Sequence, residues 1–146
     1  MSMALAVSFR SIPVELGNYN ALTTLDLGNN SLNGSILEEL SNLSQLQCLV
    51  LSYNNLNGKI HSKGSKYFNQ IYDIPNSSYV QNHGVYDLSY NRLTGSILEE
   101  LGNYMVVMDL LLSNNMLSRK IPRSLAQLSN FTTLDLSSKN LYVNPF

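Results

Sequence analysis

The chain contains several similar copies of one short segment. Residues 22–32 read LTTLDLGNNSL and residues 131–141 read FTTLDLSSKNL. When the copies are aligned on the asparagine that closes each of them, they fall 24, 37, 24 and 24 residues apart, at Asn30, Asn54, Asn91, Asn115 and, in the fifth copy, Lys139. A repeat of this length indicates a stack of structural units, because a short segment with one apolar face buries that face only against its neighbours.

Each copy follows the pattern L-x-x-L-x-L-x-x-N-x-L, which is the leucine-rich-repeat pattern. Leucines at the fourth and sixth positions face inward, as on a strand with one buried face, and we expect the fifth and seventh positions to face solvent. The third copy keeps Leu88 and Asn91 but has His83 and Tyr86 in place of its first two leucines. We predict parallel strands centred near 25–27, 49–51, 86–88, 110–112 and 134–136, on the concave side of a curved coil.

The second half of each copy spaces its leucines by three. Examples are LEELSNLSQ at 37–45 and PRSLAQLSN at 122–130. This spacing suits 3₁₀ or irregular turns on the convex side. The predicted fold class is therefore an α/β solenoid in one domain, 1–146, with units at 22–45, 46–82, 83–106, 107–130 and 131–146 and a partial unit at 12–21.

The unit 46–82 is longer than its neighbours, because it holds a 13-residue insertion within 61–82. The inserted segment is rich in aromatic residues. It can be interpreted as a functional loop, because insertions in a solenoid map to loops on one face. The other interpretation is that its apolar residues pack on the convex side and cover the core.

The repeated asparagines are predicted to form a ladder. At the bend after each strand, the side-chain amide can donate to backbone carbonyls of a neighbouring coil. A lysine has no acceptor, so we expect the ladder to weaken at Lys139. The glycines that recur four residues after the asparagine permit a tight turn, and they are Gly34, Gly58 and Gly95.

Composition excludes several functions. The net charge is −1 and 13% of residues are charged, so the chain lacks the basic surface of a nucleic-acid-binding protein. One cysteine and two histidines offer no disulfide and no metal cluster, and no nucleophile–base pair is evident. The sequence therefore predicts no catalysis, cofactor or metal. We also expect no membrane span, and MSMALAVSFR lacks the basic start of a signal peptide.

The concave face of the middle units differs from that of the outer ones. Its outward positions carry apolar Val50, Val85 and Leu111, and Tyr53 and Tyr90 share one column on adjacent strands about 4.8 Å apart. Amphipathic aromatics above exposed apolar residues are typical of protein-binding hot spots. The candidate partner-binding residues are Val50, Tyr53, Val85, Asp87, Tyr90, Asp109 and Leu111. The alternative is that LSYN is a common variant of the repeat and that the tyrosines merely cover the sheet.

Five Asn-x-Ser/Thr sequons are candidate glycosylation sites in a secreted parent protein. They begin at Asn29, Asn33, Asn42, Asn76 and Asn130. We expect glycans at Asn42, Asn76 and Asn130, which lie off the predicted strands. A glycan at Asn29 would narrow the concave face.

Other residues resemble a known family. SIPVEL at 11–16 and KIPRSL at 120–125 resemble the plant-specific class of leucine-rich repeats in receptor-like kinases and receptor-like proteins. More narrowly, residues 63–103 with VVMDLLLSNNMLS at 106–118 are similar to an internal ectodomain segment of the excess-microsporocytes receptor kinases. The resemblance covers roughly residues 12–141. It implies an extracellular segment that binds a small secreted protein ligand and a co-receptor kinase of the somatic-embryogenesis type.

Two functional hypotheses remain. The first is a ligand-binding or co-receptor-binding segment of a cell-surface receptor. The second is a non-receptor scaffold or inhibitor-like protein, or a truncated product without retained binding. In either case, leucines of the terminal coils would face water, so we expect a tendency to associate end to end.

Overall fold

The computed structural model describes residues 1–4, 10–43, 45–60, 84–99, 107–127, 132–138 and 140–143. The predicted insertion at 61–82, the sequons at Asn76 and Asn130, and Lys139 lie outside these ranges. Within them, no helix is both long and apolar enough to cross a membrane.

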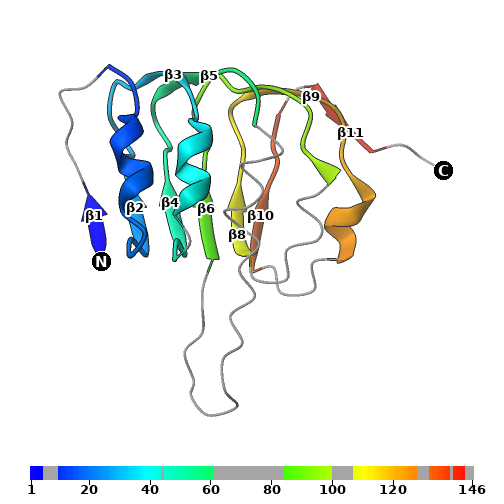
Figure 1. The fold of residues 1–146 in the computed structure, drawn as a ribbon. Helices are drawn as coiled ribbons and strands as arrows, with labels where there is room; N and C mark the ends of the chain where they lie inside the picture. Colours follow the sequence, from blue (N-terminus) through cyan, green and yellow to red (C-terminus); the bar gives the residue numbers. More distant parts are fainter. Residues whose placement is uncertain are drawn as a thin grey trace, which may run out of the picture.

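One parallel sheet runs through the whole coil (Figure 1), in the order β1-β2-β4-β6-β8-β10. The five predicted strands are confirmed, although each begins slightly earlier than expected. A sixth strand, β1, pairs its Met3 with Leu25 and was not predicted, because SMA lacks the leucine pattern. The strands are β1 (Ser2–Ala4), β2 (Thr24–Asp26), β4 (Cys48–Val50), β6 (Gly84–Asp87), β8 (Val107–Leu111) and β10 (Thr133–Asp135).

The strand register places the fourth position of every unit in one column. Leu25 pairs with Leu49, Leu49 with Tyr86, Tyr86 with Leu110, and Leu110 with Leu134. The register shifts between Gly84 and Val85, where β6 meets β8. A bulge of this kind bends one strand relative to its neighbour. The pairing is therefore irregular between β6 and β8, two of the strands that carry the candidate partner-binding residues.

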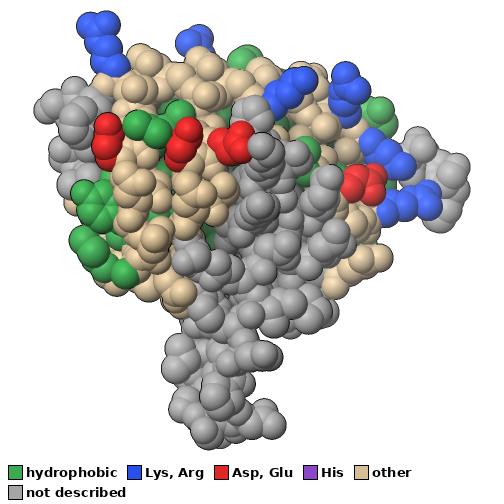
Figure 2. All heavy atoms as spheres, viewed as in Figure 1, with side chains coloured by type: hydrophobic (Ala, Val, Ile, Leu, Met, Phe, Trp, Pro, Cys, Tyr) green, Lys and Arg blue, Asp and Glu red, His purple; other side chains and the backbone are tan. Residues whose placement is uncertain are grey.

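Within the described ranges, the outer face of the coil carries three short 3₁₀ helices, as the leucine spacing predicted for 37–45 and 122–130. Each helix buries one leucine in the core. The first two, η1 (Val14–Asn18) and η2 (Glu38–Asn42), pack closely, because a side chain at Gly17 would come within 2.5 Å of the carbonyl oxygen of Glu39. Acidic side chains form a row across the part of this face that carries η1 and η2 (Figure 2). The helices are η1 (Val14–Asn18), η2 (Glu38–Asn42) and η5 (Arg123–Gln127).

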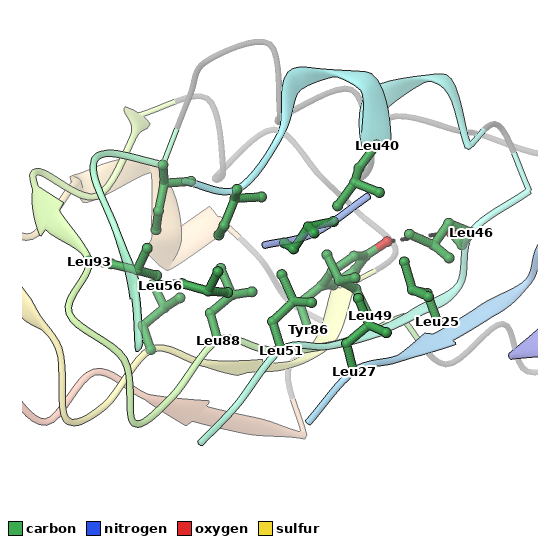
Figure 3. Close-up of a cluster of buried hydrophobic side chains, with 14 of the residues drawn as sticks. Leu25, Leu27, Leu40, Leu46, Leu49, Leu51, Leu56, Tyr86, Leu88 and Leu93 are labelled. Carbon is green, nitrogen blue, oxygen red and sulfur yellow. Dashed lines mark hydrogen bonds between the residues drawn. The ribbon is translucent and has the colours of Figure 1, made fainter. Parts of the chain in front are cut away.

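Leucines from both halves of each unit fill the space between the sheet and the 3₁₀ helices (Figure 3). Leu25, Leu27 and Leu40 are completely buried. Tyr86 replaces a leucine in this core. Its ring is buried and its hydroxyl lies 3.5 Å from the carbonyl oxygen of Leu46, to which it donates. Tyrosine is accommodated at this core position because its buried hydroxyl has a hydrogen-bond acceptor.

A second set of short strands follows the asparagine of each unit, and the sequence did not predict it. These segments pair in parallel between successive coils, and Lys59 bridges to Thr94. The backbone φ angle is positive at Gly34 (80°), Gly58 (79°) and Gly95 (86°), and Arg119 adopts 84° at the equivalent place. The strands are β3 (Asn33–Ser35), β5 (Asn55–Asn57), β7 (Thr94–Gly95), β9 (Met116–Lys120) and β11 (Asn140–Tyr142).

Candidate partner-binding surface

The asparagines hold the coils at fixed spacing beneath the candidate surface. Nδ2 of Asn54 donates to the carbonyl oxygen of Leu27 in the preceding coil over 2.9 Å, and its Oδ1 accepts from the backbone N–H of Leu32 over 3.0 Å. Asn91 and Asn115 make the same pair of bonds to their preceding coils. Asn30 donates to carbonyl oxygens of its own coil. Backbone groups that would be buried without partners are thereby satisfied.

The residue before each of these asparagines has a left-handed backbone. The φ angles are 53° at Asn29, 56° at Tyr53, 52° at Tyr90 and 53° at Asn114. Asparagine adopts this conformation with little strain, whereas for a bulky residue it is a true outlier. Tyr53 and Tyr90 therefore occupy a backbone position for which the flanking coils use the better suited residue. The repeat pattern alone gave no sign of this strain.

The two tyrosines stack on each other. Their ring centroids lie 4.2 Å apart and the ring planes differ by 9°. Tyr53 is 55% exposed and Tyr90 is 45% exposed, so the pair projects from the surface instead of closing over the core. The hydrogen bond between the two side chains is the main cause that raises the pKa of the Tyr53 phenol, with smaller contributions from burial, from Tyr90 and from the charge of Asp87.

Aspartates at the fifth position of three units cap the end of their own strands. Oδ1 of Asp87 accepts from the backbone N–H of Ser89 over 3.0 Å and from its hydroxyl over 2.6 Å. Asp135 is held in the same way by Ser137, which lowers the pKa of its carboxyl. Asp26 accepts from the backbone N–H of Gly28. Asp87 is thus a fixed negative charge on the candidate surface.

The apolar candidates Val50, Val85 and Leu111 are all half-buried on the concave strands. The expectation that the seventh position also faces solvent was wrong for Ser52, Ser89 and Ser113, which are buried. Neighbouring fifth-position side chains cover this column. For example, a side chain at Gly28 would come within 3.1 Å of Cγ1 of Val50 and 3.2 Å of Oδ1 of Asp26. The exposed surface is therefore narrower than the sequence predicted.

Asp109 lies deeper than expected. It pairs in register with Val85 on one side and Thr133 on the other. Its Oδ1 atom is buried and has no hydrogen-bond partner in the described part of the chain. The position is next to the bulge between β6 and β8, which re-aims side chains locally.

The remaining polar residues to place are Cys48 and the sequon asparagines of the described ranges. Cys48 is half-buried on β4, and burial, followed by the charges of Asp26 and Asp87, raises the pKa of its thiol, which disfavours the reactive thiolate. The side chains of Asn29, Asn33 and Asn42 are exposed, Asn29 on the concave side beside Tyr53, Asn33 on β3 and Asn42 on η2. In the described ranges, no three His, Cys, Asp or Glu side chains are grouped closely enough to hold a metal ion.

Comparison with known proteins agrees with this architecture. A family model described as Leucine Rich Repeat matches residues 21–43, 87–104 and 107–128. The chain is 58% identical over 68 residues to the leucine-rich repeat receptor protein kinase EMS1 of Arabidopsis thaliana. The chain is a leucine-rich-repeat solenoid. The matched region covers 47% of the solenoid and 6% of that kinase, so the solenoid corresponds to a small part of the relative.

Solved structures extend the similarity over most of the solenoid. The ectodomain of the plant membrane receptor kinase GASSHO1/SCHENGEN3 from Arabidopsis thaliana, in complex with CASPARIAN STRIP INTEGRITY FACTOR 2, has a TM-score of 0.77 and 32% identity. That match covers 97% of the solenoid and 16% of the ectodomain. The Arabidopsis receptor kinase HAESA, in complex with the peptide hormone IDA and the co-receptor SERK1, has a TM-score of 0.73 and 30% identity over 90% of the solenoid and 20% of its own chain.

Proposed function

We propose that the chain is a protein-binding segment of a receptor-kinase ectodomain, which recognises a secreted protein or peptide ligand, or a co-receptor, through its concave face. The observation that carries this proposal is the exposed stack of Tyr53 and Tyr90 on a left-handed backbone. The proposal implies an extracellular location and a non-catalytic role.

The stack is unfavourable for the isolated fold. A left-handed backbone costs a residue with a side chain about 1–2 kcal/mol, and two large rings are left in water. Asn29 and Asn114 show that the flanking coils avoid both penalties at the equivalent place. Local strain that the fold does not need is found preferentially at binding sites. Exposed, pre-ordered tyrosines are also frequent in binding hot spots, because few rotors are frozen when a partner covers them.

The comparisons support the kind of partner proposed. GASSHO1/SCHENGEN3 was solved with a ligand, and HAESA was solved with a peptide hormone and a co-receptor. EMS1, to which the chain is similar over 68 residues, is also a receptor kinase. Because the chain spans small fractions of these relatives, its ligand is proposed only by class.

Site-specific cross-linking would test the surface. A photoreactive benzoylphenylalanine replaces Val50 on the concave side or, as the control, Glu39 on the convex η2 helix, and each protein is exposed to secreted plant proteins. We expect a discrete adduct from position 50 that disappears when Tyr53→Asn and Tyr90→Asn are added. Asparagine is chosen because the same backbone position accepts it in the flanking coils.

Quantitative titration of the captured protein would then compare variants. We expect Tyr53→Ala with Tyr90→Ala to weaken binding at least about tenfold, the range of a hot spot, while Glu38→Ala with Glu39→Ala has no effect. Circular dichroism checks that both variants are folded. Equal adducts from positions 50 and 39, or equally small effects of the two double variants, would favour the scaffold, inhibitor-like or truncated-product hypothesis.

A further inference from the structure

The described charged residues of the main sheet are all of one sign, and the described basic residues lie on other elements. Acidic residues also occur on the convex helices η1 and η2. All the charged side chains on the six strands of the main sheet are acidic, within the part of the chain that the structure describes. They are Asp26, Asp87, Asp109 and Asp135. The described lysines and arginines lie on other elements, and many gather along the rim that carries β3, β5, β9 and β11 (Figure 2).

This separation favours a cationic partner on the concave face. Among the described residues, no lysine or arginine lies on these strands to neutralise the carboxylates. A concave surface of one sign raises the local concentration of oppositely charged partners and accelerates their association. The negative faces of the two exposed tyrosine rings add to the same field.

The tyrosine stack and Asp87 form the most specific part of this surface. Asp87 and Tyr90 belong to the same coil. Asp87 also lies close enough to Tyr53 for its charge to contribute to the raised pKa of the Tyr53 phenol. Within the described ranges, both hydrogen bonds to Asp87 reach Oδ1. We infer that Oδ2 can accept from a donor on a partner.

Among the described residues, the flanking coils carry nothing as large as tyrosine beside the stack, so we expect its outer ring faces to be accessible. The tyrosines stack face to face, so each has one face against the other and one face turned to the flanking coil. Those coils carry the shorter side chains of Asn29 and Asn114 in the same column. A planar group can thus lie against either outer face.

We propose that the partner of this surface presents an arginine, which stacks its guanidinium on the outer face of Tyr53 or Tyr90 and donates to the carboxylate of Asp87. The inference rests on the proposed function, because it names the chemistry that the concave face recognises. Guanidinium is the only side-chain cation that is planar, stacks on aromatic rings and pairs with a carboxylate in two parallel hydrogen bonds. A lysine would supply the positive charge but neither the planar stacking group nor the two parallel hydrogen bonds.

The arginine proposal is tested by titrating short peptides into the whole chain, whose tyrosine rings are isotope-labelled and observed by NMR. The probes are blocked nine-residue Gly-Ser peptides that contain three arginines, three lysines or three glutamates. We expect the arginine peptide to bind about threefold or more tightly than the lysine peptide, which is the size of an exposed cation–π contact, and to shift the ring signals of Tyr53 and Tyr90. The glutamate peptide should not bind.

Three variants localise the effect. Tyr53→Asn with Tyr90→Asn should remove the preference for arginine over lysine. Asp87→Asn keeps an acceptor at the end of the strand but removes the charge, so it should weaken binding of both cationic peptides. Glu38→Gln with Glu39→Gln removes two charges from the convex side and should leave all three titrations unchanged.

Arginine binding no tighter than lysine binding, or an arginine preference that survives the tyrosine substitutions, would overturn the inference. Tight binding of the glutamate peptide would overturn it as well, by pointing to the basic rim. If the cross-linked adduct at position 50 persists while the arginine preference is absent, the inference fails and the proposed function stands. Loss of both the cross-linked adduct and the arginine preference would contradict the inference and the proposed function alike.

Discussion

Asn91 and Leu51 lie 40 residues apart in the sequence, yet Nδ2 of Asn91 donates to the carbonyl oxygen of Leu51 over 2.9 Å. Oδ1 of the same side chain accepts from the backbone N–H of Leu56 over 3.0 Å. One buried amide therefore satisfies a donor and an acceptor of the preceding coil. This bond pair spans the long unit, so it joins the coils on either side of the insertion.

Asn91→Ala should be among the most damaging substitutions in the chain. It leaves the N–H of Leu56 buried without this partner, which costs about 1–3 kcal/mol, whereas the carbonyl of Leu51 keeps its bond from Nδ2 of Asn54 over 3.0 Å. We expect urea denaturation to show a loss of about 2 kcal/mol in the free energy of unfolding. Asn57→Ala, at an exposed asparagine of β5, should change it by less than about 0.5 kcal/mol. Similar losses for both variants would contradict the structural role of Asn91.

The repeat period was sufficient to predict the main sheet, because leucines such as Leu25 and Leu49 recur at the same place in four of the five units, and Tyr86 takes this place in the third. The second strands were missed because β5 and its neighbours pair through backbone groups, whatever their side chains. The acceptor role of Asn91 was also missed, since it depends on which N–H the preceding coil brings beneath it. For the candidate surface, the sequence placed Tyr53 and Tyr90 in one column but could not show their ring stacking, which depends on backbone angles.

Arg119→Gly should stabilise the chain. Arg119 has a φ of 84° at the place where Gly34, Gly58 and Gly95 have 80°, 79° and 86°. Glycine removes the left-handed penalty of about 1–2 kcal/mol, offset in part by its larger backbone entropy in the unfolded state. We expect a net gain of about 0.5–1 kcal/mol, visible as a melting temperature higher by about 2 °C.

Arg92→Gly is the matched control, because Arg92 is also exposed but is absent from the positive-φ positions of the described chain. It should lower stability slightly through backbone entropy. The reverse substitution Gly95→Ala should also destabilise, since its Cβ would meet Cγ of Lys59 at 3.1 Å. An unchanged or lower melting temperature for Arg119→Gly would show that the chain tolerates this φ without strain.

Tyr90→Phe should lower the pKa of Tyr53. The hydrogen bond with Tyr90 is the main cause that raises this pKa in the folded state. A raised folded-state pKa contributes stability that is fully present below the ordinary tyrosine pKa and is lost as the pH rises through the folded value. The variant should therefore lose less stability than the wild type in alkaline solution. NMR titration of the Tyr53 ring carbon measures the shift directly, and Tyr142→Phe, at a distant exposed tyrosine, should leave it unchanged.

Glycosylation at Asn29 should weaken partner binding. The Asn29 side chain is exposed on the concave side, in the same column as Tyr53, whereas the Asn42 side chain is exposed on η2. When the chain is expressed through a secretory pathway, we expect mass spectrometry to find a glycan at Asn42. Wherever Asn29 is also occupied, Asn29→Gln should restore binding, while Asn42→Gln should not. A bare Asn42 in secreted protein would contradict the assignment of this sequon.

Leu134→Lys should reduce self-association without unfolding the chain. Leu134 occupies the same core column as Leu110, but it is 43% exposed, whereas Leu110 is only 2% exposed. It lies on β10, an edge strand of the main sheet, and an edge strand with exposed apolar side chains is a template for pairing with another chain. We expect the wild type to show a concentration-dependent increase of mass in sedimentation velocity, with β1 of one copy against β10 of the next.

The Leu134→Lys variant should suppress this self-association. Leu110→Lys should instead unfold the chain, because it buries an unpaired charge. A monomeric wild type at every concentration would show that the exposed edge alone does not drive end-to-end association.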